Sequence, residues 1–247
     1  MLIKSNKDTT YLAGDIAWHY YKFNKKKFDK VVNVWGADHY GDVPGLEAGV
    51  EAIGYKGQLD TILLQFITLF RGKEKLKMSK RSGTYVTMDE LLDEVGKDVV
   101  RFFFLQRSAD RHLNFDLFIA KQESEKNPVF YTQYAHARMG GILRKSGDDI
   151  SICDFSKLEH KSELGLIKHL IRFPEIIEET VKDYQIQRVP QYAIDLAKAF
   201  SGFYRDCQVV IEKDEEVKKA RIALIIASRI ILKDCLDLMG VGAPEKM

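Results

Sequence analysis

Val31-Val32-Asn33-Val34-Trp35-Gly36 is the stretch that decides the fold class of this chain. Its β-branched residues and its tryptophan favour a strand, and the glycine ends the run, so the pattern predicts a short buried strand. A helix is expected before it. Asp15 is placed to cap that helix, and apolar residues from Ile16 to Phe23 recur along its length.

A second helix and a second strand follow. Pro44 suits a first helical turn and Gly54 a helix end, and the apolar run 62–70 predicts a strand. Strand, helix and strand in this order normally close as a right-handed parallel crossover. Because ligands bind beyond the carboxyl ends of parallel strands, Gly36-Ala37-Asp38-His39 and the basic loop after Phe70 are expected near one crevice.

The second half of the chain has helical apolar spacing throughout. Residues 189–207 keep three-and-four spacing on one face, with Pro190 in the first turn. Residues 217–238 are apolar on more than one face, as in a central bundle helix. Pro174 should break the helical stretch 158–184. The sequence therefore predicts an α/β part with a parallel sheet, residues 1–118, followed by an all-α helical bundle, residues 119–247.

Composition excludes several classes of protein. The chain has 247 residues, 45% of them hydrophobic and 30% charged, with a formal net charge of +2. No apolar run has the length of a membrane span, and the N-terminus does not resemble a signal peptide. The three cysteines form no CxxC pair, so we expect small buried residues in a reducing cytosol. No His/Cys cluster has metal-ligand spacing.

The loop Lys77-Met78-Ser79-Lys80-Arg81-Ser82-Gly83 carries the clearest chemical signal. Two lysines three apart, among small residues, form a cationic loop that can lie over a triphosphate. Fixed cations stabilise the charge that develops on phosphate oxygens during nucleotidyl transfer. The plain alternative is an exposed basic turn, which charge alone would favour.

The string Lys-Met-Ser-Lys resembles the second signature of class I aminoacyl-tRNA synthetases. The resemblance implies that Lys77 and Lys80 stabilise the transition state of amino-acid adenylation, and that Met78 and Ser79 lie against the nucleotide. Among these enzymes the chain is most similar to arginyl-tRNA synthetases. That likeness covers essentially the whole chain in order, and further stretches that carry it are Tyr11-Leu12-Ala13-Gly14-Asp15-Ile16-Ala17, Trp35-Gly36-Ala37-Asp38-His39-Tyr40-Gly41, Asp98-Val99-Val100-Arg101-Phe102-Phe103-Phe104-Leu105 and Asn127-Pro128-Val129-Phe130-Tyr131-Thr132-Gln133-Tyr134-Ala135-His136-Ala137-Arg138.

The resemblance implies an incomplete Rossmann-type nucleotide-binding fold with a site for arginine. A guanidinium presents five donors that a carboxylate can accept in pairs, so Asp15 is the matching candidate, with Tyr11 and His39 beside it. Gly36 allows backbone to approach a nucleotide, and Asp38 can accept from ribose or ammonium. On the residues alone, Asp15 could instead be only a helix cap and Tyr11 an ordinary strand residue.

The stretch 127–138 opens the helical anticodon-binding domain in that family. Tyr131, Tyr134 and Arg138 interleave aromatic and basic groups, which read unpaired bases by stacking and edge hydrogen bonds. Met247, at the end of a family-like C-terminal stretch, is the fourth candidate for a tRNA contact. The spacing also suits a partly buried face, so at least one of the two tyrosines is expected in the core.

One departure from the family bears on activity. Class I synthetases also carry a His-Ile-Gly-His-type signature, and none of the six histidines begins such a tetrad. The first strand and helix of the nucleotide-binding fold are also expected to be missing, so Met1 is expected to mark a truncated chain. We expect this polypeptide alone not to form arginyl-adenylate.

The partners that the resemblance implies are tRNA(Arg), L-arginine and ATP, with Mg²⁺ accompanying the ATP and no structural metal. The intact enzyme is expected to be a cytoplasmic monomer that does not associate with a membrane. Two other interpretations stay open: a non-catalytic tRNA-binding module kept for its helical domain, and a class I synthetase for cysteine, methionine or glutamate.

Overall fold

The computed structural model describes residues 1–76, 86–146 and 153–247. The chain forms two compact units. Unit 1 consists of Met1–Ile67 and Ala109–Leu113, and unit 2 of Thr68–Ser108 and Asn114–Met247. Among the described residues, no helix is long and apolar enough to cross a membrane.

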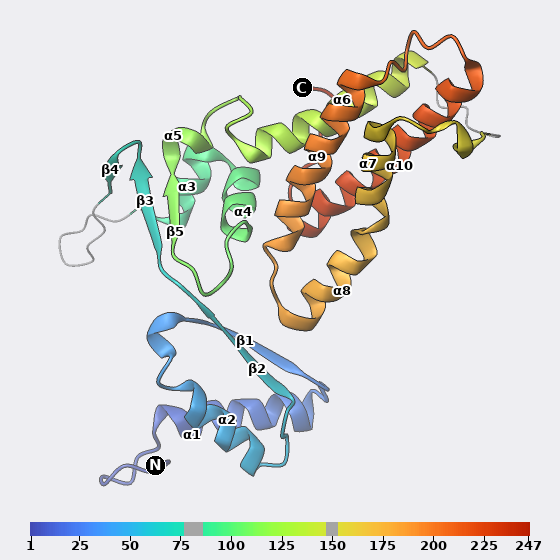
Figure 1. Ribbon diagram of the computed structural model, residues 1–247. Coiled ribbons are helices and arrows are strands. Elements are labelled where there is room, and N and C mark those ends of the chain that lie inside the picture. The colour runs from blue at the N-terminus through green and yellow to red at the C-terminus, as the bar shows by residue number, and fades with distance from the viewer. Residues whose placement is uncertain (77–85, 147–152) are drawn as a thin grey trace. The chain divides into compact units, whose positions relative to one another are not determined.

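Unit 1 is an α/β unit built on two strands (Figure 1). The strands pair in parallel, with Val31 opposite Leu59 and Gly36 opposite Leu64, so the predicted parallel strand–helix–strand unit is confirmed. Its elements are α1 (Tyr11–Tyr20), the π-helical turn η1 (Tyr21–Lys25), β1 (Val31–Gly36), the 3₁₀ turn η2 (Ala37–His39), α2 (Val43–Ala52) and β2 (Leu59–Leu64).

The start of α1 differs from the sequence prediction. Thr10 is the N-cap, and its hydroxyl oxygen accepts a hydrogen bond from the backbone N–H of Ala13 over 3.3 Å. Asp15 lies inside the helix, so its interpretation as the cap was wrong. Tyr11 is the first residue of this helix, so the alternative that it is an ordinary strand residue was also wrong. Threonine is a favoured cap in its own right, which places the start of the helix before the acidic residue.

The apolar run 62–70 was wrongly interpreted as one strand. It divides into β2, which ends at Leu64, and β3 (Ile67–Arg71). Between them the backbone N–H of Gln65 donates to the carbonyl of Ala109 over 2.8 Å. The chain leaves the β1–β2 pair at this point because its next backbone partner comes from a different segment, which periodicity within the run cannot reveal.

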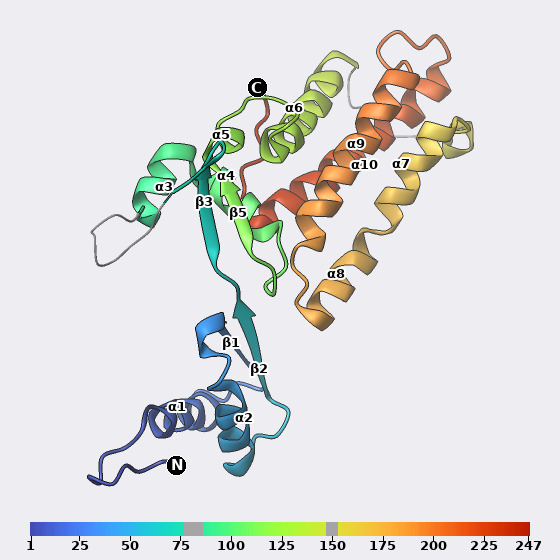
Figure 2. The ribbon, with the colours of Figure 1, turned by 60° about the vertical axis from the view of Figure 1, so that its left-hand side comes forward.

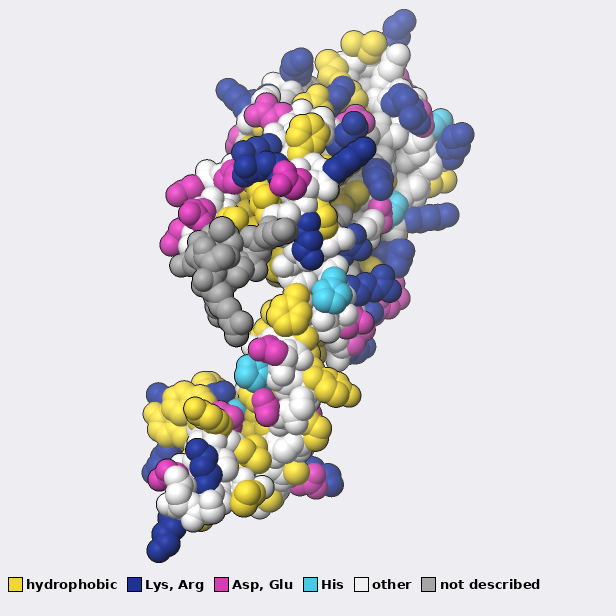
Figure 3. All heavy atoms as spheres, turned by 90° about the vertical axis from the view of Figure 1, so that its left-hand side faces the viewer, with side chains coloured by type: hydrophobic (Ala, Val, Ile, Leu, Met, Phe, Trp, Pro, Cys, Tyr) yellow, Lys and Arg dark blue, Asp and Glu magenta, His cyan; other side chains and the backbone are white. Residues whose placement is uncertain are grey.

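The strand β1, which was expected to be buried, is buried on one face only. Val31 packs with Phe23, Leu46, Val50 and Leu59 in the core of unit 1, but Val32 and Val34 keep 39% and 58% of their surface exposed. Hydrophobic side chains are accordingly visible on the surface of this unit (Figure 3).

Unit 2 opens with a small sheet in the order β4-β3-β5 and continues as helices. Phe102 and Phe115 are fully buried, and the ring centroids of Phe103 and Phe115 lie 5.3 Å apart. The elements of this part are β3 (Ile67–Arg71), β4 (Glu74–Lys75), α3 (Met88–Val95), α4 (Lys97–Leu105), β5 (Leu113–Asp116) and α5 (Leu117–Ala120).

The predicted helical bundle is confirmed. The long helices α6, α7, α9 and α10 lie side by side in both ribbon views and share one core (Figures 1 and 2). Pro190 lies in the first turn of α9, and Pro174 in the first turn of α8, where it separates α7 from α8. The elements are α6 (Pro128–Ser146), η3 (Phe155–Lys157), α7 (Lys161–Ile171), α8 (Phe173–Asp183), α9 (Arg188–Asp206) and α10 (Glu215–Met239).

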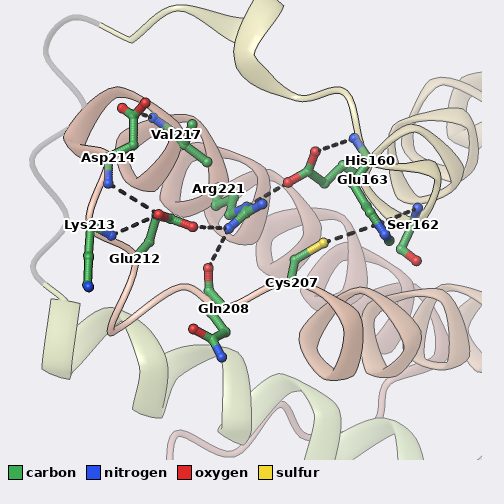
Figure 4. A network of polar contacts seen from close by, with 10 residues as sticks. All are labelled: His160, Ser162, Glu163, Cys207, Gln208, Glu212, Lys213, Asp214, Val217 and Arg221. Carbon is green, nitrogen blue, oxygen red and sulfur yellow. Dashed lines mark hydrogen bonds and ion pairs between the residues drawn. The ribbon is translucent and has the colours of Figure 1, made fainter.

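A polar network ties α7, α10 and the connection after α9 together (Figure 4). Arg221 donates to the carboxylates of Glu163 and Glu212, each over 2.6 Å, and to the carbonyl of Gln208 over 2.7 Å. Because Glu163 is 1% exposed, this network replaces water as its hydrogen-bonding partner.

The three cysteines are free thiols. Cys207 and Cys235 are buried as expected, whereas Cys153 is only half-buried. Burial raises the pKa of the Cys207 thiol to about 11, and the neighbouring charge of Glu163 contributes in the same direction. Cys207 is therefore a neutral thiol, and it lies 3.4 Å from Nδ1 of His160.

Candidate functional site

A cavity of about 380 Å³ opens at the carboxyl end of β1 within unit 1. It lies where the rule for open parallel sheets places ligands. It brings together Tyr11, Asp15 and His39, which the sequence had singled out as candidates for binding arginine. The lining consists of Tyr11, Leu12, Asp15, Trp35, His39, Gly41, Asp42, Gly45 and Leu46.

The helix α1, which carries Asp15 and Tyr11, is fastened to β1 by a buried histidine. His19 is 3% exposed, and its Nδ1 lies 2.7 Å from the carbonyl of Asp15, so Nδ1 must donate its proton there. Nε2 is then an acceptor, and the amide nitrogen of Asn33 on β1 donates to it over 3.0 Å. These two hydrogen bonds fix the position of the α1 turn that carries Asp15 relative to β1, the strand that leads to His39.

His39 enters the cavity from the turn η2 at the end of β1. Its Nδ1 lies 3.1 Å from a carboxylate oxygen of Asp42, and its ring centroid lies 5.6 Å from that of Trp35. The hydrogen bond that His39 donates to Asp42 raises the pKa of His39 above its ordinary value of 6.5, and the charges of Asp38 and Asp15 act in the same direction.

Gly36 and Asp38 form a tight corner just after β1. A Cβ atom at Gly36 would lie 2.4 Å from Oδ1 of Asp38, so a larger residue there would require the Asp38 side chain to move. Asp38 itself is exposed. Gly36 and Asp38, which the sequence interpretation assigned to nucleotide binding, thus lie side by side at the end of β1.

The electrostatics of the cavity favour a cationic ligand. Asp15 and Asp42 present two carboxylates, which His39 partly balances when it is protonated. The rings of Tyr11 and Trp35 supply flat faces on which a planar cation can stack. A guanidinium group, with its fork of donors, matches this lining better than a compact ammonium does.

Lys77, Met78, Ser79 and Lys80 lie outside the described residues. Their expected position beside the strand ends, and their roles on the triphosphate, therefore stay predictions. The strand before them, β4, ends at Lys75 in unit 2.

Unit 2 presents a second candidate surface, which we call the α6–α9 surface. Two adjoining cavities of about 470 and 300 Å³ share Arg138, Phe200 and Ser201. Their remaining lining is Glu123, Ser124, Glu125, Phe130, Tyr131, Tyr134, Ala135, Tyr204 and Arg205. Figure 3 shows Lys and Arg side chains interleaved with hydrophobic ones on the face of unit 2 that it presents.

Arg138 is the centre of the α6–α9 surface. Its guanidinium carbon lies 4.6 Å from the ring centroid of Tyr204 and 5.8 Å from that of Tyr134. Its Nη1 also donates to the hydroxyl of Tyr134 over 3.2 Å. Two aromatic rings thus hold one exposed guanidinium in a fixed orientation, which suits stacking against a base or pairing with a phosphate.

The two tyrosines on α6 take different positions. Tyr131 is half-buried against the bundle core, and its hydroxyl donates to Ser201 over 3.2 Å, while Tyr134 is 41% exposed. Met247 is not part of the α6–α9 surface but lines a neighbouring cavity with Phe130.

Sequence reasoning missed several residues of both sites. Trp35 and Asp42 flank His39. Trp35 was quoted only as part of a motif, and Asp42 was not singled out. Tyr204 lies in the stretch 189–207, for which only a helix face was predicted, yet its ring holds Arg138. Helical spacing could indicate that Tyr204 borders the core, but its partner lies on α6, far away in the sequence, so no local pattern could reveal the pair.

Together these observations define an α/β unit with an acidic cavity at the carboxyl end of β1, and a helical bundle with an aromatic–basic surface. The family described as "tRNA synthetases class I (R), catalytic domain" matches residues 1–147. The family described as "DALR anticodon binding domain" matches residues 132–247. The chain belongs to the family of class I arginyl-tRNA synthetases.

Individual relatives agree with that assignment. The chain is 45% identical over 252 residues to the arginine–tRNA ligase of Bacillus subtilis, and 44% identical over 258 residues to that of Heliobacterium modesticaldum. Both alignments cover 100% of this chain but only 45% and 46% of the relative. The chain thus spans slightly under half the length of the curated relatives that it matches.

Solved structures show the same fold. A structure from Campylobacter jejuni superimposes with a TM-score of 0.89 at 31% identity and covers 100% of this chain and 54% of the other. The Thermus thermophilus arginyl-tRNA synthetase superimposes with a TM-score of 0.83 at 21% identity, a likeness that concerns the fold alone. It also covers 100% of this chain, and 50% of that one.

Proposed function

We propose that this chain serves the ATP-dependent activation of L-arginine and its transfer to tRNA(Arg). The observation that carries the proposal is the cavity in unit 1, where Tyr11, Asp15 and His39 converge at the carboxyl end of β1. It supports a site for a planar cation in a protein of the arginyl-tRNA synthetase family.

In this proposal Asp15 accepts hydrogen bonds from the guanidinium of arginine. Tyr11 adds a ring face and a hydroxyl, and His39 closes the cavity from the other side. Two nitrogens of the guanidinium can donate to the two oxygens of one carboxylate. This bidentate pairing fixes the orientation of the ligand and also neutralises its charge. The buried bond between His19 and Asp15's carbonyl supports this, because it holds the carboxylate's helix turn in place.

The nucleotide lies at the corner formed by Gly36 and Asp38, with His39 beside it. Met78 and Ser79 contact ATP, and Lys77 and Lys80 stabilise the charge that develops on the leaving pyrophosphate. Mg²⁺ enters with the ATP phosphates as part of the substrate. The position of Gly36 at the end of β1, followed by Asp38 in η2, supports the placement of the nucleotide at this corner.

The tRNA contacts are assigned to Tyr131, Tyr134, Arg138 and Met247. The exposed ring of Tyr134 and the guanidinium of Arg138 are arranged for stacking on unpaired bases. Tyr131 contributes mainly through its hydroxyl, because its ring packs on the core. We place the protein in the cytoplasm, as its free thiols suit a reducing compartment, and we expect the intact enzyme to be a monomer.

Two measurements test the proposal. Fluorescence anisotropy with labelled arginine tRNA should show saturable binding that falls as salt rises, and weaker binding of an anticodon-substituted transcript. Equal binding of both transcripts, or none, would contradict the assignment of the α6–α9 surface. The second measurement is ATP–pyrophosphate exchange with arginine and tRNA.

For the exchange assay we expect no turnover from this polypeptide alone, because no His-Ile-Gly-His-type tetrad occurs in its sequence. Exchange should appear when a polypeptide carrying that signature and the preceding part of the fold is supplied. Robust exchange without it would show that the chain holds a complete activating site.

A second candidate function is a non-catalytic tRNA-binding module. The arrangement of Arg138 between Tyr134 and Tyr204 favours it, because this surface lies entirely within unit 2. Specific tRNA binding combined with a lack of exchange in the supplemented assay would select this function over arginine activation.

A further inference from the structure

The chain beyond α10 is fastened to the bundle by side chains from other helices. Gly240 ends α10 with a φ of 64°, which turns the chain back along the bundle. Val241 is 3% exposed and packs into the core. We call residues 241–247 the strap. It forms no helix or strand, so its position depends on the bonds that it receives.

The first anchor of the strap is a three-way contact at Gly242. The backbone N–H of Gly242 donates to Oδ2 of Asp98 on α4 over 3.0 Å, and its carbonyl accepts from Nε2 of Gln133 on α6 over 2.9 Å. Nε2 of Gln133 also donates to Oδ2 of Asp98 over 2.9 Å. Both backbone groups of one strap residue are thereby satisfied by two helices.

The second anchor is His136 on α6, which is fully buried. Its Nδ1 lies 2.9 Å from the carbonyl of Pro244, so this nitrogen carries the proton and donates it. Burial lowers the pKa of His136, and the charge of Arg229 acts in the same direction. The ring is therefore neutral, and it binds the strap through a single directed hydrogen bond.

The third anchor is Glu245, near the end of the strap. Its carboxylate pairs with Arg229 on α10, and Arg144 on α6 donates to its carbonyl over 3.1 Å. The side chain of Glu245 is 62% exposed. Exposed pairs of this kind contribute little to stability, so the main consequence of this anchor is where the last residues lie.

The strap ends beside the α6–α9 surface. Met247 lines a cavity of about 400 Å³ together with Phe130 and Gln133. The ring of Phe130 stacks on that of Tyr134 with centroids 6.2 Å apart, and Phe130 also lines the larger cavity of the α6–α9 surface. A flexible thioether side chain is thus delivered to the edge of an aromatic platform.

We propose that Glu245, with Arg144 and Arg229, is a positioning group that holds Met247 at the RNA-binding surface. The inference rests on the proposed tRNA binding and extends it to residues that do not line either cavity. Pre-organising the strap removes the cost of ordering it when RNA binds, so loosening it should weaken binding without unfolding the bundle.

The first test observes the strap directly. The methyl signal of Met247 is recorded by NMR in the full chain labelled at its methionine methyl groups. Glu245→Ala should shift and narrow this signal, whereas Asp237→Ala should leave it unchanged. Asp237 forms a comparable exposed pair with Lys233 on α10, so it is a matched control. An unchanged Met247 signal in Glu245→Ala would overturn the proposal.

The second test is a double-mutant cycle on tRNA affinity. We expect Glu245→Ala and Met247→Ala each to weaken binding by about threefold to tenfold, and the double variant to bind no more weakly than Met247→Ala. Additive losses would show that Glu245 acts apart from Met247 and would reject the inference, as would a normal affinity for Glu245→Ala. If the unsubstituted chain binds no tRNA, the proposed function itself fails.

Discussion

Arg221 on α10 and Glu163 on α7 form a nearly buried ion pair, with Nε donating to Oε1 over 2.6 Å. Their side chains are 13% and 1% exposed. The other oxygen of Glu163 accepts from the backbone N–H of His160 over 2.8 Å, which completes the capping box of α7. One carboxylate therefore joins two helices and caps one of them.

Arg221→Ala should destabilise the bundle strongly. Removal of the arginine leaves a buried carboxylate without its charged partner, which typically costs about 3–5 kcal/mol of unfolding free energy. Urea denaturation followed by circular dichroism measures it. The matched control is Lys233→Ala, which removes an exposed ion-pair partner of Asp237 on the same helix and should cost less than about 1 kcal/mol. Equal losses would contradict the importance of burial.

Asn33→Ala should loosen the attachment of α1 in unit 1. It removes the donor to Nε2 of buried His19 and leaves that nitrogen unsatisfied, a loss of about 1–3 kcal/mol. Hydrogen exchange should quicken in α1 before it quickens in α9, because the two helices belong to different units. Exchange that rises equally in both helices would contradict a local role.

His39 should titrate above its ordinary pKa of 6.5, because Asp42 holds its protonated form. Since the folded-state pKa is raised, the stabilisation is fully present below the unfolded value and is lost as pH rises through the folded value. An NMR titration of the imidazole signals measures the pKa. Asp42→Asn should lower the pKa of His39, whereas the control Asp29→Asn, just before β1, should not. An unchanged pKa in Asp42→Asn would refute Asp42 as the cause of the shift.

Asp15→Asn should weaken the binding of L-arginine without lowering thermal stability. The exchange of carboxylate for amide removes a charge-assisted hydrogen bond worth about 1.5–3 kcal/mol, roughly tenfold to a hundredfold in affinity. NMR shifts of the His39 and Trp35 rings on titration with L-arginine report occupancy. Citrulline, which has the same shape without the charge, should bind poorly to the unsubstituted chain.

The same variant separates two interpretations of Asp15. Because Thr10 caps α1, the loss of the carboxylate should leave the melting temperature unchanged. A clear fall in melting temperature with unaltered arginine binding would restore the structural interpretation and remove Asp15 from the site.

Arg138→Ala should reduce tRNA affinity by about 1–3 kcal/mol, the usual contribution of one stacked base. Arg138→Lys should recover only part of it, because an ammonium cannot stack between Tyr134 and Tyr204 as a planar guanidinium does. Lys182→Ala on α8, a side chain that is 74% exposed, is the control for general loss of positive charge. Equal losses for Arg138 and Lys182 would indicate non-specific attraction.

Local patterns in the sequence were sufficient for most of the fold. Val31 to Gly36 predicted a strand, and the spacing from Val189 to Cys207 predicted a helix face, because side-chain periodicity is a property of a single element. Helix and strand ends were less predictable. Thr10 and Asp15 are both good caps, and only the folded backbone shows which of them accepts the bond.

The sequence by itself determined the class of the protein, through Lys-Met-Ser-Lys and the motifs around Asp15 and His39. Only the tertiary structure decided that Asp15 and His39 line one cavity, that Tyr204 holds Arg138, and that Glu245 fastens the end of the chain. The reason is physical. Motifs record which groups are present, whereas contacts between distant segments depend on how helices pack, and packing is decided jointly by all of their faces.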